Sequence, residues 1–253
     1  MEIEGLAAVV TGAASGLGAA TAAMLSAAGA NVTILDRDRA TGEAHAQAIG
    51  GRFVAADVTD ADGIEAALIE AEASFGVARI LVNCAGIAPA IKTVGRDGVA
   101  HKLVDFRRAV EINLVGTFNV LSQFAARLIP AEPVGEERGV IVNTASVAAY
   151  DGQMGQAAYG ASKSGVVGLT LPVARDLARE KIRVMTIAPG IFMTPMMKGL
   201  PQAAQDSLGQ QVPHPSRLGQ PEEYAKLVQA IITNPMLNGE VIRLDGAIRM
   251  GPR

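Results

Sequence analysis

Three residues near the middle of the chain form a set that could move a proton: Ser146, Tyr159 and Lys163. A free tyrosine hydroxyl has a pKa of roughly 10 and is a poor base at neutral pH. A lysine ammonium held close to it favours the phenolate and lowers that pKa. Tyr159 could then exchange a proton with an alcohol or a carbonyl, while Ser146 hydrogen-bonds the same oxygen. We therefore expect all three residues to be catalytic, with Ser146 and Tyr159 binding the substrate.

The elements around these residues would bring them together. The apolar run at residues 140–142 is typical of a strand buried on both faces, and Ser146 follows where that strand should end. A helix that begins near Gln156 would carry Tyr159 and Lys163 on one face, because they are four residues apart. The Tyr-x-x-x-Lys spacing is common by chance, so ordinary roles as a half-buried tyrosine, a solvated lysine and a strand-end cap stay open at this point.

A glycine-rich turn lies near the start of the chain. An apolar run at residues 6–10 is followed by Gly12, Gly16 and Gly18 and then by an alanine-rich helical stretch to about Ala28. Strand, glycine-rich turn and helix are the context of a dinucleotide-binding loop, in which the helix N-terminus faces the pyrophosphate. The spacing Gly-x-x-x-Gly-x-Gly differs from the commonest fingerprint, so a simple tight turn is the alternative interpretation.

The second strand, residues 31–35, is followed by Asp36. An acidic side chain about twenty residues beyond the glycine loop can accept hydrogen bonds from the adenosine ribose hydroxyls. It would also repel a 2′-phosphate, so Asp36 favours NAD over NADP. Arg37 and Arg39 weaken this prediction slightly, because a basic side chain can hold that phosphate.

Three more strand ends carry residues suited to a nucleotide. After residues 52–56, Asp57 could accept from the adenine amino group and Val58 could pack on the ring, or the same turn could cap the next helix through Thr59 and Asp60. The other two strand ends, after residues 80–82 and 182–188, are predicted to contact the cofactor through Asn83, Cys84, Ala85, Gly86, Pro189 and Gly190. Cys84 is interpreted as a small packed residue rather than a nucleophile.

Two further segments bear on the site. Asn113 lies in a helix expected over residues 103–129; its amide could hold a water or a backbone group near Lys163, or be a satisfied core amide. Residues 191–216 are rich in Met, Pro, Gly and Gln and are predicted to form a lid, from which Thr194 could reach a cofactor carboxamide. An ordinary irregular excursion is the alternative.

Apolar strands alternate with helical stretches along the whole chain, including a helix at residues 221–233 and a last strand at residues 240–244. This alternation predicts an α/β fold: a single-domain, Rossmann-like, doubly wound parallel sheet of about seven strands with helices on both faces. Residues 1–253 would form this one domain. Ligands bind such sheets at the carboxyl ends of the strands, and the candidate residues follow those ends.

Composition excludes several classes. The 253 residues are 49% hydrophobic, which is ample for a core, and the formal net charge of -3 argues against a nucleic-acid binder. A single cysteine excludes an internal disulfide and suits a reducing compartment. No apolar run has membrane-spanning length and no leader pattern precedes the first strand, so we expect a cytoplasmic protein with no membrane or nucleic-acid partner. No metal site is predicted.

The combination of motifs resembles the short-chain dehydrogenase/reductase family over essentially the whole chain. The resemblance rests on the glycine turn, Asn83-x-Ala85-Gly86, Asn113, Ser146, Tyr159-x-x-x-Lys163 and Pro189-Gly190. It implies that Asn113 is a fourth catalytic residue.

Longer stretches, among them residues 143–149, 183–190 and 238–250, resemble the type 2 short-chain 3-hydroxyacyl-CoA dehydrogenases within that family. This resemblance implies NAD, a homotetramer and oxidation of short 3-hydroxyacyl-CoA. It also implies cofactor contacts at Ser15, Leu17, Asp36, Asp57, Val58, Cys84, Tyr159, Lys163 and Phe192.

Several alternatives to this function stay open. They are a 3-oxoacyl-carrier-protein reductase, a hydroxysteroid or secondary-alcohol dehydrogenase, and a non-catalytic dinucleotide-binding subunit; an RNA-binding role is disfavoured by the acidic balance. Basic residues that could meet CoA phosphates, or simply be solvated, are Lys92, Lys102, Lys198 and Arg217.

Overall fold

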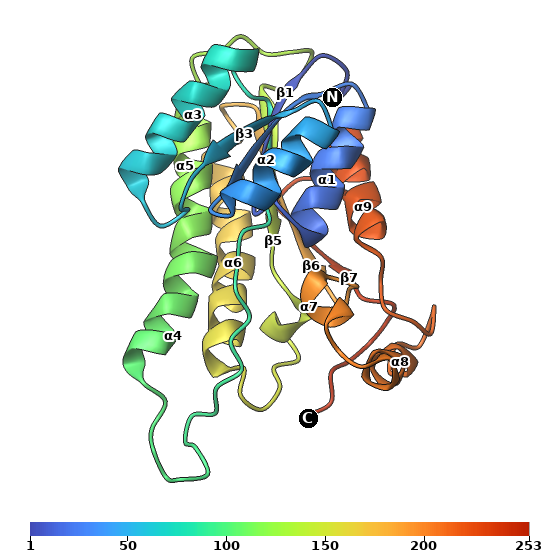
Figure 1. Ribbon diagram of the computed structural model, residues 1–253. Coiled ribbons are helices and arrows are strands. Elements are labelled where there is room, and N and C mark those ends of the chain that lie inside the picture. Colours follow the sequence, from blue (N-terminus) through green and yellow to red (C-terminus); the bar gives the residue numbers. More distant parts are fainter. Residues whose placement is uncertain (253) are drawn as a thin grey trace.

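A seven-stranded parallel sheet runs through the centre of the computed structural model, which describes residues 1–252 (Figure 1). The strands lie in the order β3-β2-β1-β4-β5-β6-β7, so the chain starts in the middle of the sheet and winds outward in both directions. The prediction of a doubly wound parallel sheet of about seven strands is therefore confirmed. The strands are β1 (Ala7–Thr11), β2 (Asn31–Asp36), β3 (Arg52–Ala55), β4 (Ile80–Asn83), β5 (Gly139–Thr144), β6 (Ile182–Pro189) and β7 (Val241–Leu244).

Helices cover both faces of this sheet, as predicted. The helices α1, α2 and α9 pack on one face, and α3, α5 and α6 pack on the other (Figure 1). The helices are α1 (Gly16–Ala27), α2 (Arg39–Ala48), α3 (Ala61–Phe75), α4 (Leu103–Val110), α5 (Gly116–Leu128), α6 (Ala157–Asp176), α7 (Pro195–Lys198), α8 (Gln202–Gln210) and α9 (Pro221–Thr233).

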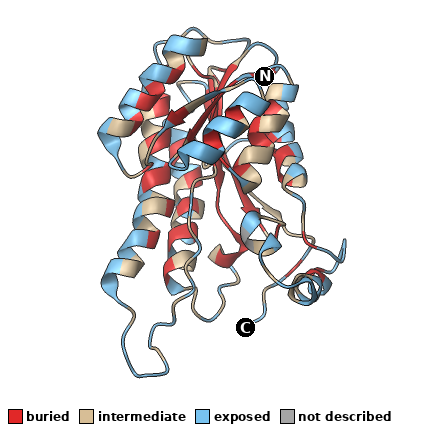
Figure 2. Ribbon diagram, viewed as in Figure 1, coloured by how far each residue is buried: buried red, intermediate tan, exposed pale blue. Residues whose placement is uncertain are grey.

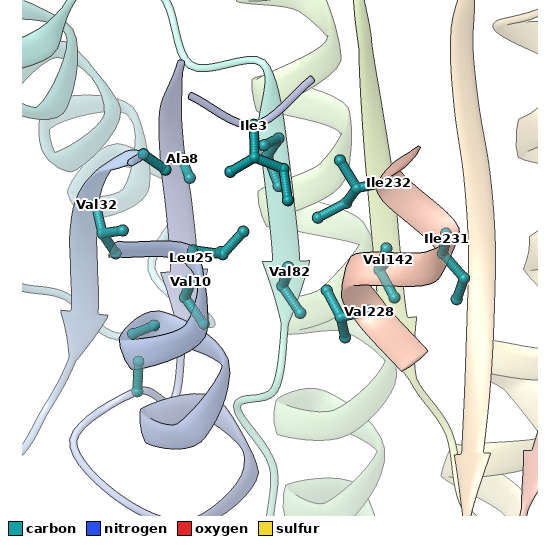
Figure 3. Packing of buried hydrophobic residues seen from close by; sticks show 14 of the residues in the cluster. Ile3, Ala8, Val10, Leu25, Val32, Val82, Val142, Val228, Ile231 and Ile232 are labelled. Atoms are coloured by element: carbon teal, nitrogen blue, oxygen red, sulfur yellow. The ribbon is translucent and has the colours of Figure 1, made fainter. Parts of the chain in front are cut away.

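The continuous apolar runs of the central strands have a direct structural cause. Every residue of β1, β4, β5 and β6 is buried, because helices cover both faces of those strands (Figure 2). On the α1 and α9 face, Val10, Val82 and Val142 of three strands lie opposite Leu25 of α1 and Val228 of α9 (Figure 3). This packing holds the strand ends, where the candidate residues lie, at fixed positions.

Two expected segments differ in detail from the structure. The helix expected over residues 103–129 is divided, because the π-helical segment η1 (Glu111–Val115) joins α4 to α5. The π-helical turn η1 inserts one extra residue into this helix, which changes the direction in which the helix side chains point.

Residues 191–216 are less irregular than their composition indicates, since they contain α7 and α8.

Arg183 anchors β6 at its start. This buried side chain forms an ion pair with Glu137, with Nε at 2.6 Å from Oε2, and donates to the carbonyls of Ile231, Ile232 and Leu237. Glu137 also accepts from the ammonium of Met1 at 2.9 Å. Arg183 therefore satisfies carbonyls at the C-terminal end of α9, which would otherwise be buried without donors.

We expect Arg183→Met to lower the free energy of unfolding by about 3 kcal/mol, because it removes one partner of a buried ion pair and takes the side-chain donor from the Ile231 and Leu237 carbonyls, whereas the Ile232 carbonyl keeps the Met1 ammonium. Urea unfolding would measure this change. The matched control is Arg39→Met, because Arg39 forms an exposed pair with Glu43 and such pairs contribute about 0–1 kcal/mol. Equal effects of the two substitutions would contradict the assignment.

Candidate active site

A cavity of about 760 Å³ lies at the carboxyl ends of the strands. All the predicted cofactor-binding and catalytic residues line it, except Asn83 and Asn113. The nominated residues that line it are Gly12, Ser15, Gly16, Leu17, Gly18, Asp36, Asp57, Val58, Cys84, Ala85, Gly86, Ser146, Tyr159, Lys163, Pro189, Gly190, Phe192 and Thr194.

The glycine turn between β1 and α1 fits a pyrophosphate. A Cβ at Gly12 would lie 2.6 Å from the Ala85 backbone, and one at Gly18 would lie 2.4 Å from the Gly12 carbonyl oxygen, so only glycine is accommodated at both positions. Gly12 also has a positive φ of 64°. The first-turn N–H groups of α1 have no partner within that helix and face a cavity lined by Gly16, Leu17 and Gly18. These donors suit a bound diphosphate.

Asp36 ends β2 at the wall of the cavity and is held in place by backbone groups. Its Oδ2 accepts from the N–H of Ala14 at 2.9 Å, and its Oδ1 accepts from the N–H of Asp38 at 3.0 Å. The two arginines that could have reversed its preference are engaged elsewhere: Arg37 lies 3.4 Å from Asp57, and Arg39 pairs with Glu43 at 2.9 Å. The carboxylate of Asp36 therefore gives the cavity wall at the end of β2 a negative charge.

Asp57 lies at the cavity wall and is held by the turn that leads into α3. Its side chain lines the cavity and its Oδ1 accepts from the N–H and the hydroxyl of Thr59 at 3.0 and 2.8 Å. Burial alone would raise the pKa of Asp57, but the bonds from Thr59 and the charge of Arg37 outweigh burial and lower it. The helix cap itself is Asp60, which accepts from the N–H of Gly63.

Ser146, Tyr159 and Lys163 converge on one end of the cavity. Ser146 lies two residues beyond β5, and its Oγ accepts from the N–H of Ala148 at 3.1 Å, which leaves its hydroxyl hydrogen available to another oxygen. Tyr159 and Lys163 lie one turn apart on α6, as predicted. The Lys163 side chain is buried and its Nζ donates to the Thr144 carbonyl at 2.7 Å.

One electrostatic expectation is wrong in direction in this structure. Lys163 was expected to lower the pKa of Tyr159, but burial raises the pKa of Tyr159, and the nearby hydroxyl of Ser146 offsets only part of this effect. The reason is that the Lys163 ammonium is directed at the Thr144 carbonyl. Burial also lowers the pKa of Lys163 itself, to about 8.

Asn113 does not line the cavity; it joins the loop after β4 to α6 through hydrogen bonds. Its Oδ1 accepts from the N–H of Ile87 at 2.8 Å, and its Nδ2 donates to the Ile87 carbonyl and to Ser162 Oγ, both at 2.9 Å. Asn113 therefore holds a backbone group and is at the same time a fully buried, satisfied amide, which are two of the three interpretations open for it. The bond to Ser162 fixes the loop after β4 against α6, which carries Lys163.

Asn83 lies one layer below the cavity. Thr11, Asn83 and Asn143 are in register on three neighbouring strands. Asn83 accepts from Thr11 Oγ1 at 3.4 Å and donates to Asn143 Oδ1 at 3.0 Å. Asn83 therefore aligns strand ends and does not line the cavity, whereas its neighbour Cys84 does. Burial raises the pKa of the Cys84 thiol, as suits a packed residue rather than a nucleophile.

Several lining residues were not found from the sequence. Thr144 ends β5 at the catalytic end of the cavity, and Gln153, Gln156 and Met250 line it as well. The C-terminal stretch that carries Met250 is joined to the loop before α6, because Gln153 Nε2 donates to the Gly251 carbonyl at 3.1 Å. Met250 has no local signal, because its proximity depends on a contact between segments 98 positions apart, whereas Thr144, Gln153 and Gln156 lie close in sequence to Ser146 and Tyr159 but belong to no motif.

A glycine turn at a helix N-terminus, an acidic residue at the second strand end and a group of a buried serine, a half-buried tyrosine and a buried lysine together define a dinucleotide-binding protein equipped for proton transfer. A family model described as short chain dehydrogenase matches residues 6–205. The chain belongs to this short-chain dehydrogenase/reductase family. It is an oxidoreductase of CH–OH groups with a nicotinamide dinucleotide cofactor and a small-molecule substrate.

Individual relatives are similar over nearly the whole chain. A 3-hydroxyacyl-CoA dehydrogenase type-2 of Homo sapiens is 56% identical over 99% of this chain and 97% of the relative. A crystal structure of 3-hydroxyacyl-CoA dehydrogenase type-2 from Mycobacterium avium superposes with a TM-score of 0.95, at 43% identity and 98% coverage of both chains. A 3-oxoacyl-[acyl-carrier-protein] reductase of Thermotoga maritima is 34% identical over 98% of this chain and 99% of the relative.

No helix within residues 1–252 combines the length and the hydrophobicity needed to cross a bilayer. The cytoplasmic location stays a prediction.

We expect Lys163→Met to stabilise the fold while it removes the proposed catalytic charge. The shift of the lysine pKa from 10.5 to about 8 corresponds to about 3 kcal/mol of destabilisation. Losing the bond to Thr144 offsets about 1–2 kcal/mol of the gain, so the variant should be more stable by about 1–2 kcal/mol at pH 7. Urea unfolding would measure this difference.

The pH dependence tests the cause of that gain. The pKa of Lys163 in the folded state lies below its pKa in the unfolded state. The destabilisation caused by burying the Lys163 charge is therefore fully present below about pH 8 and is lost as pH rises through 10.5. The advantage of Lys163→Met should therefore shrink between pH 8 and pH 10. Lys226→Met, at an exposed position, is the control and should change stability by less than about 0.5 kcal/mol at either pH.

Proposed function

We propose that the chain oxidises the hydroxyl group of short 3-hydroxyacyl-CoA substrates with NAD. The observation that supports this substrate best is the 56% identity to the human 3-hydroxyacyl-CoA dehydrogenase type-2 over nearly the full chain. The chemistry is supported by the Ser146, Tyr159 and Lys163 side chains on one cavity wall.

In this proposal, the glycine turn holds the pyrophosphate, Asp36 holds the adenosine ribose, and Asp57 and Val58 border the adenine. Lys163 and Tyr159 face the nicotinamide ribose, with Cys84, Pro189, Phe192 and Thr194 around the ring. When bound, oxidised nicotinamide supplies the hydride acceptor and a positive charge beside the phenol. Residues 191–216 form a lid over this end, since Thr194, Pro195, Met197 and Leu208 line the same cavity.

Oxidation releases a hydride from the substrate carbon and a proton from the substrate hydroxyl. Ser146 donates its hydroxyl hydrogen to the substrate oxygen and orients it. Tyr159 accepts the substrate proton. Burial raises its pKa in this structure, and with the cofactor bound the positive charges of the nicotinamide and of Lys163 would oppose that effect and favour the phenolate. Asn113 holds the Ile87 backbone and Ser162, and so keeps the loop after β4 in place beside Lys163. In the reverse direction the same groups reduce a ketone.

The preference for NAD follows from the charges near β2. The Asp36 carboxylate is fixed by two backbone N–H groups, and Arg37 and Arg39 are both engaged with other carboxylates. A 2′-phosphate at this position would meet that negative charge; Arg37, which also lines the cavity, is paired with Asp57 in an exposed contact. Like charges brought together at a binding site cost several kcal/mol, so NADP is disfavoured.

The runner-up function is reduction of a 3-oxoacyl group on a carrier protein, as in the name of the Thermotoga maritima relative. The lower identity of that relative and the charge of Asp36 disfavour it. A hydroxysteroid or another secondary alcohol would use the same catalytic groups. A non-catalytic dinucleotide-binding role is disfavoured because Ser146, Tyr159 and Lys163 line one cavity and Asn113 is bonded to the loop and the helix beside them.

We expect purified protein to reduce NAD in the presence of 3-hydroxybutyryl-CoA, measured by the absorbance of the reduced nicotinamide. The kcat/KM with NADP should be lower by at least about tenfold, because of Asp36. Tyr159→Phe should lower kcat by about 100- to 10,000-fold, because it removes the proton acceptor, while NADH binding measured by fluorescence stays within about twofold.

The outcomes separate the parts of the proposal. Turnover of a hydroxysteroid but of no acyl-CoA would refute the substrate and leave the catalytic groups in place. Turnover with NADP alone would refute the role of Asp36. Wild-type rates in Tyr159→Phe would refute the mechanism.

We also propose that the protein is a homotetramer. The support on this chain is a group of exposed apolar side chains along α4, η1 and α5, which would be covered by an oligomer: Leu103, Val104, Val115, Phe118 and Ile129. Exposed apolar residues clustered on one helical region are typical of an interaction surface.

Mass photometry of the wild type should give the mass of four chains. Phe118→Glu places a charge on this surface and should shift the distribution to smaller species, because burying an unpaired charge costs several kcal/mol. The exposed Met236→Glu, outside this surface, is the control and should leave the mass unchanged. A monomeric wild type would contradict the proposal.

A further inference from the structure

Tyr224 is a completely buried tyrosine outside the cavity lining. It lies on α9 within the apolar core on the α1 side of the sheet and has an exposed fraction of 0%. A phenylalanine would supply the same packing, so the hydroxyl needs a separate explanation. A buried hydroxyl costs free energy unless it is hydrogen-bonded, and this one lies 2.7 Å from Thr144 Oγ1 and 3.8 Å from Cys84 Sγ.

The direction of these bonds follows from the number of hydrogens. Thr144 Oγ1 donates to the Asn83 carbonyl at 2.6 Å, and its one hydrogen is then used. Tyr224 must therefore donate to Thr144. The backbone carbonyl of the same threonine accepts from Lys163 Nζ at 2.7 Å. Thr144 is thus held by its side chain from α9 and β4, and it holds the ammonium of Lys163 with its backbone.

We propose that Tyr224 is a positioning residue for the proposed dehydrogenase reaction: its hydroxyl fixes Thr144 so that the Thr144 carbonyl holds the Lys163 ammonium in the cavity. The inference rests on the proposed function for its kinetic consequence. Tyr224 acts through Thr144 and needs no contact with substrate or cofactor, which explains why a polar atom is present in an otherwise apolar part of the core.

Two titratable groups lie around Lys163: the thiol of Cys84 on the loop after β4 and the phenol of Tyr159 on its own helix. Tyr159 shares no hydrogen bond with Tyr224, and the Cys84 thiol, 3.8 Å from the Tyr224 hydroxyl, is kept neutral because burial raises its pKa, so neither adds a charge beside Lys163 when that hydroxyl is removed. The expected effect of Tyr224→Phe is therefore a weaker acceptor for the ammonium. Lys163 then loses its proton at a lower pH.

The test uses the full-length protein with NAD and the substrate turned over in the assay above. Tyr224→Phe should lower kcat by about 3- to 10-fold, change KM by less than about twofold, and move the alkaline limb of the kcat profile to lower pH by about half a unit or more. Tyr150→Phe removes the hydroxyl of a tyrosine that stacks on Arg243 at the surface and should shift nothing.

A double-mutant cycle separates positioning from simple loss of stability. Thr144→Val should reproduce the shift of the alkaline limb, and Tyr224→Phe with Thr144→Val should add nothing further, because both break the same connection. A lower urea midpoint in Tyr224→Phe with an unchanged alkaline limb would mean a structural role only and would overturn the proposal, as would additive effects.

A measurement of NADH binding tests the role of Tyr224 independently of the substrate proposal. The pH dependence of NADH binding, followed by fluorescence, should show the same shift in Tyr224→Phe, because the Lys163 charge faces the nicotinamide ribose in the bound form. If the wild type turns over no acyl-CoA, the substrate proposal fails, and this binding titration still decides the role of Tyr224.

Discussion

The site depends on one unfavourable requirement, which is a positive charge buried at Lys163. An ammonium withdrawn from water needs hydrogen-bond acceptors, and here the acceptor is the carbonyl of the last residue in β5. A carbonyl within the sheet is normally used by the neighbouring strand, so a strand end is where one is available for a side chain. The end of β5 and the helix that carries Lys163 must therefore lie side by side. The hydrogen bonds of Thr144 and Asn113 hold them in this arrangement.

Gly165 of α6 serves the same requirement. A helix with several glycines and an internal proline has poor intrinsic propensity, so tertiary contacts must hold it. A Cβ at Gly165 would lie 2.5 Å from the Leu114 side chain, so the absence of a side chain lets the π-helical segment approach α6 closely. That approach lets Asn113 reach both Ser162 and the Ile87 backbone. Glycine at this position lowers the helix propensity of α6, but it allows the close packing that positions Lys163.

Much of this arrangement was predictable from the sequence, for identifiable reasons. Asp36 and Ser146 follow long apolar runs, and in a parallel sheet the ends of such runs meet at one edge. Tyr159 and Lys163 share a helix face through their spacing alone. These inferences need only the period of a strand or a helix, and the structure agrees with them.

The parts that were not predictable depend on contacts between distant residues. Nothing local in the sequence tells that Asn83 points at Asn143 rather than into the cavity, since the two lie 60 positions apart. The same holds for Tyr224 and Thr144, which are separated by 80 positions. The direction of the Tyr159 pKa shift was not predictable either, because it is set by burial, which spacing does not reveal, while the Lys163 ammonium is bonded to the Thr144 carbonyl.

These distant contacts join the cofactor half of the cavity to its catalytic half. The hydroxyl of Thr11, at the end of β1, accepts from the N–H groups of Cys84 and Ala85, both at 3.2 Å. Gly12 packs against the Ala85 backbone, and Asn113 holds the same loop two residues further on. The glycine turn and Lys163 are therefore fixed to one loop from opposite sides. The distance between a bound pyrophosphate and the catalytic groups is consequently set by the sheet itself, so the fold determines where a nicotinamide ring can lie relative to Tyr159.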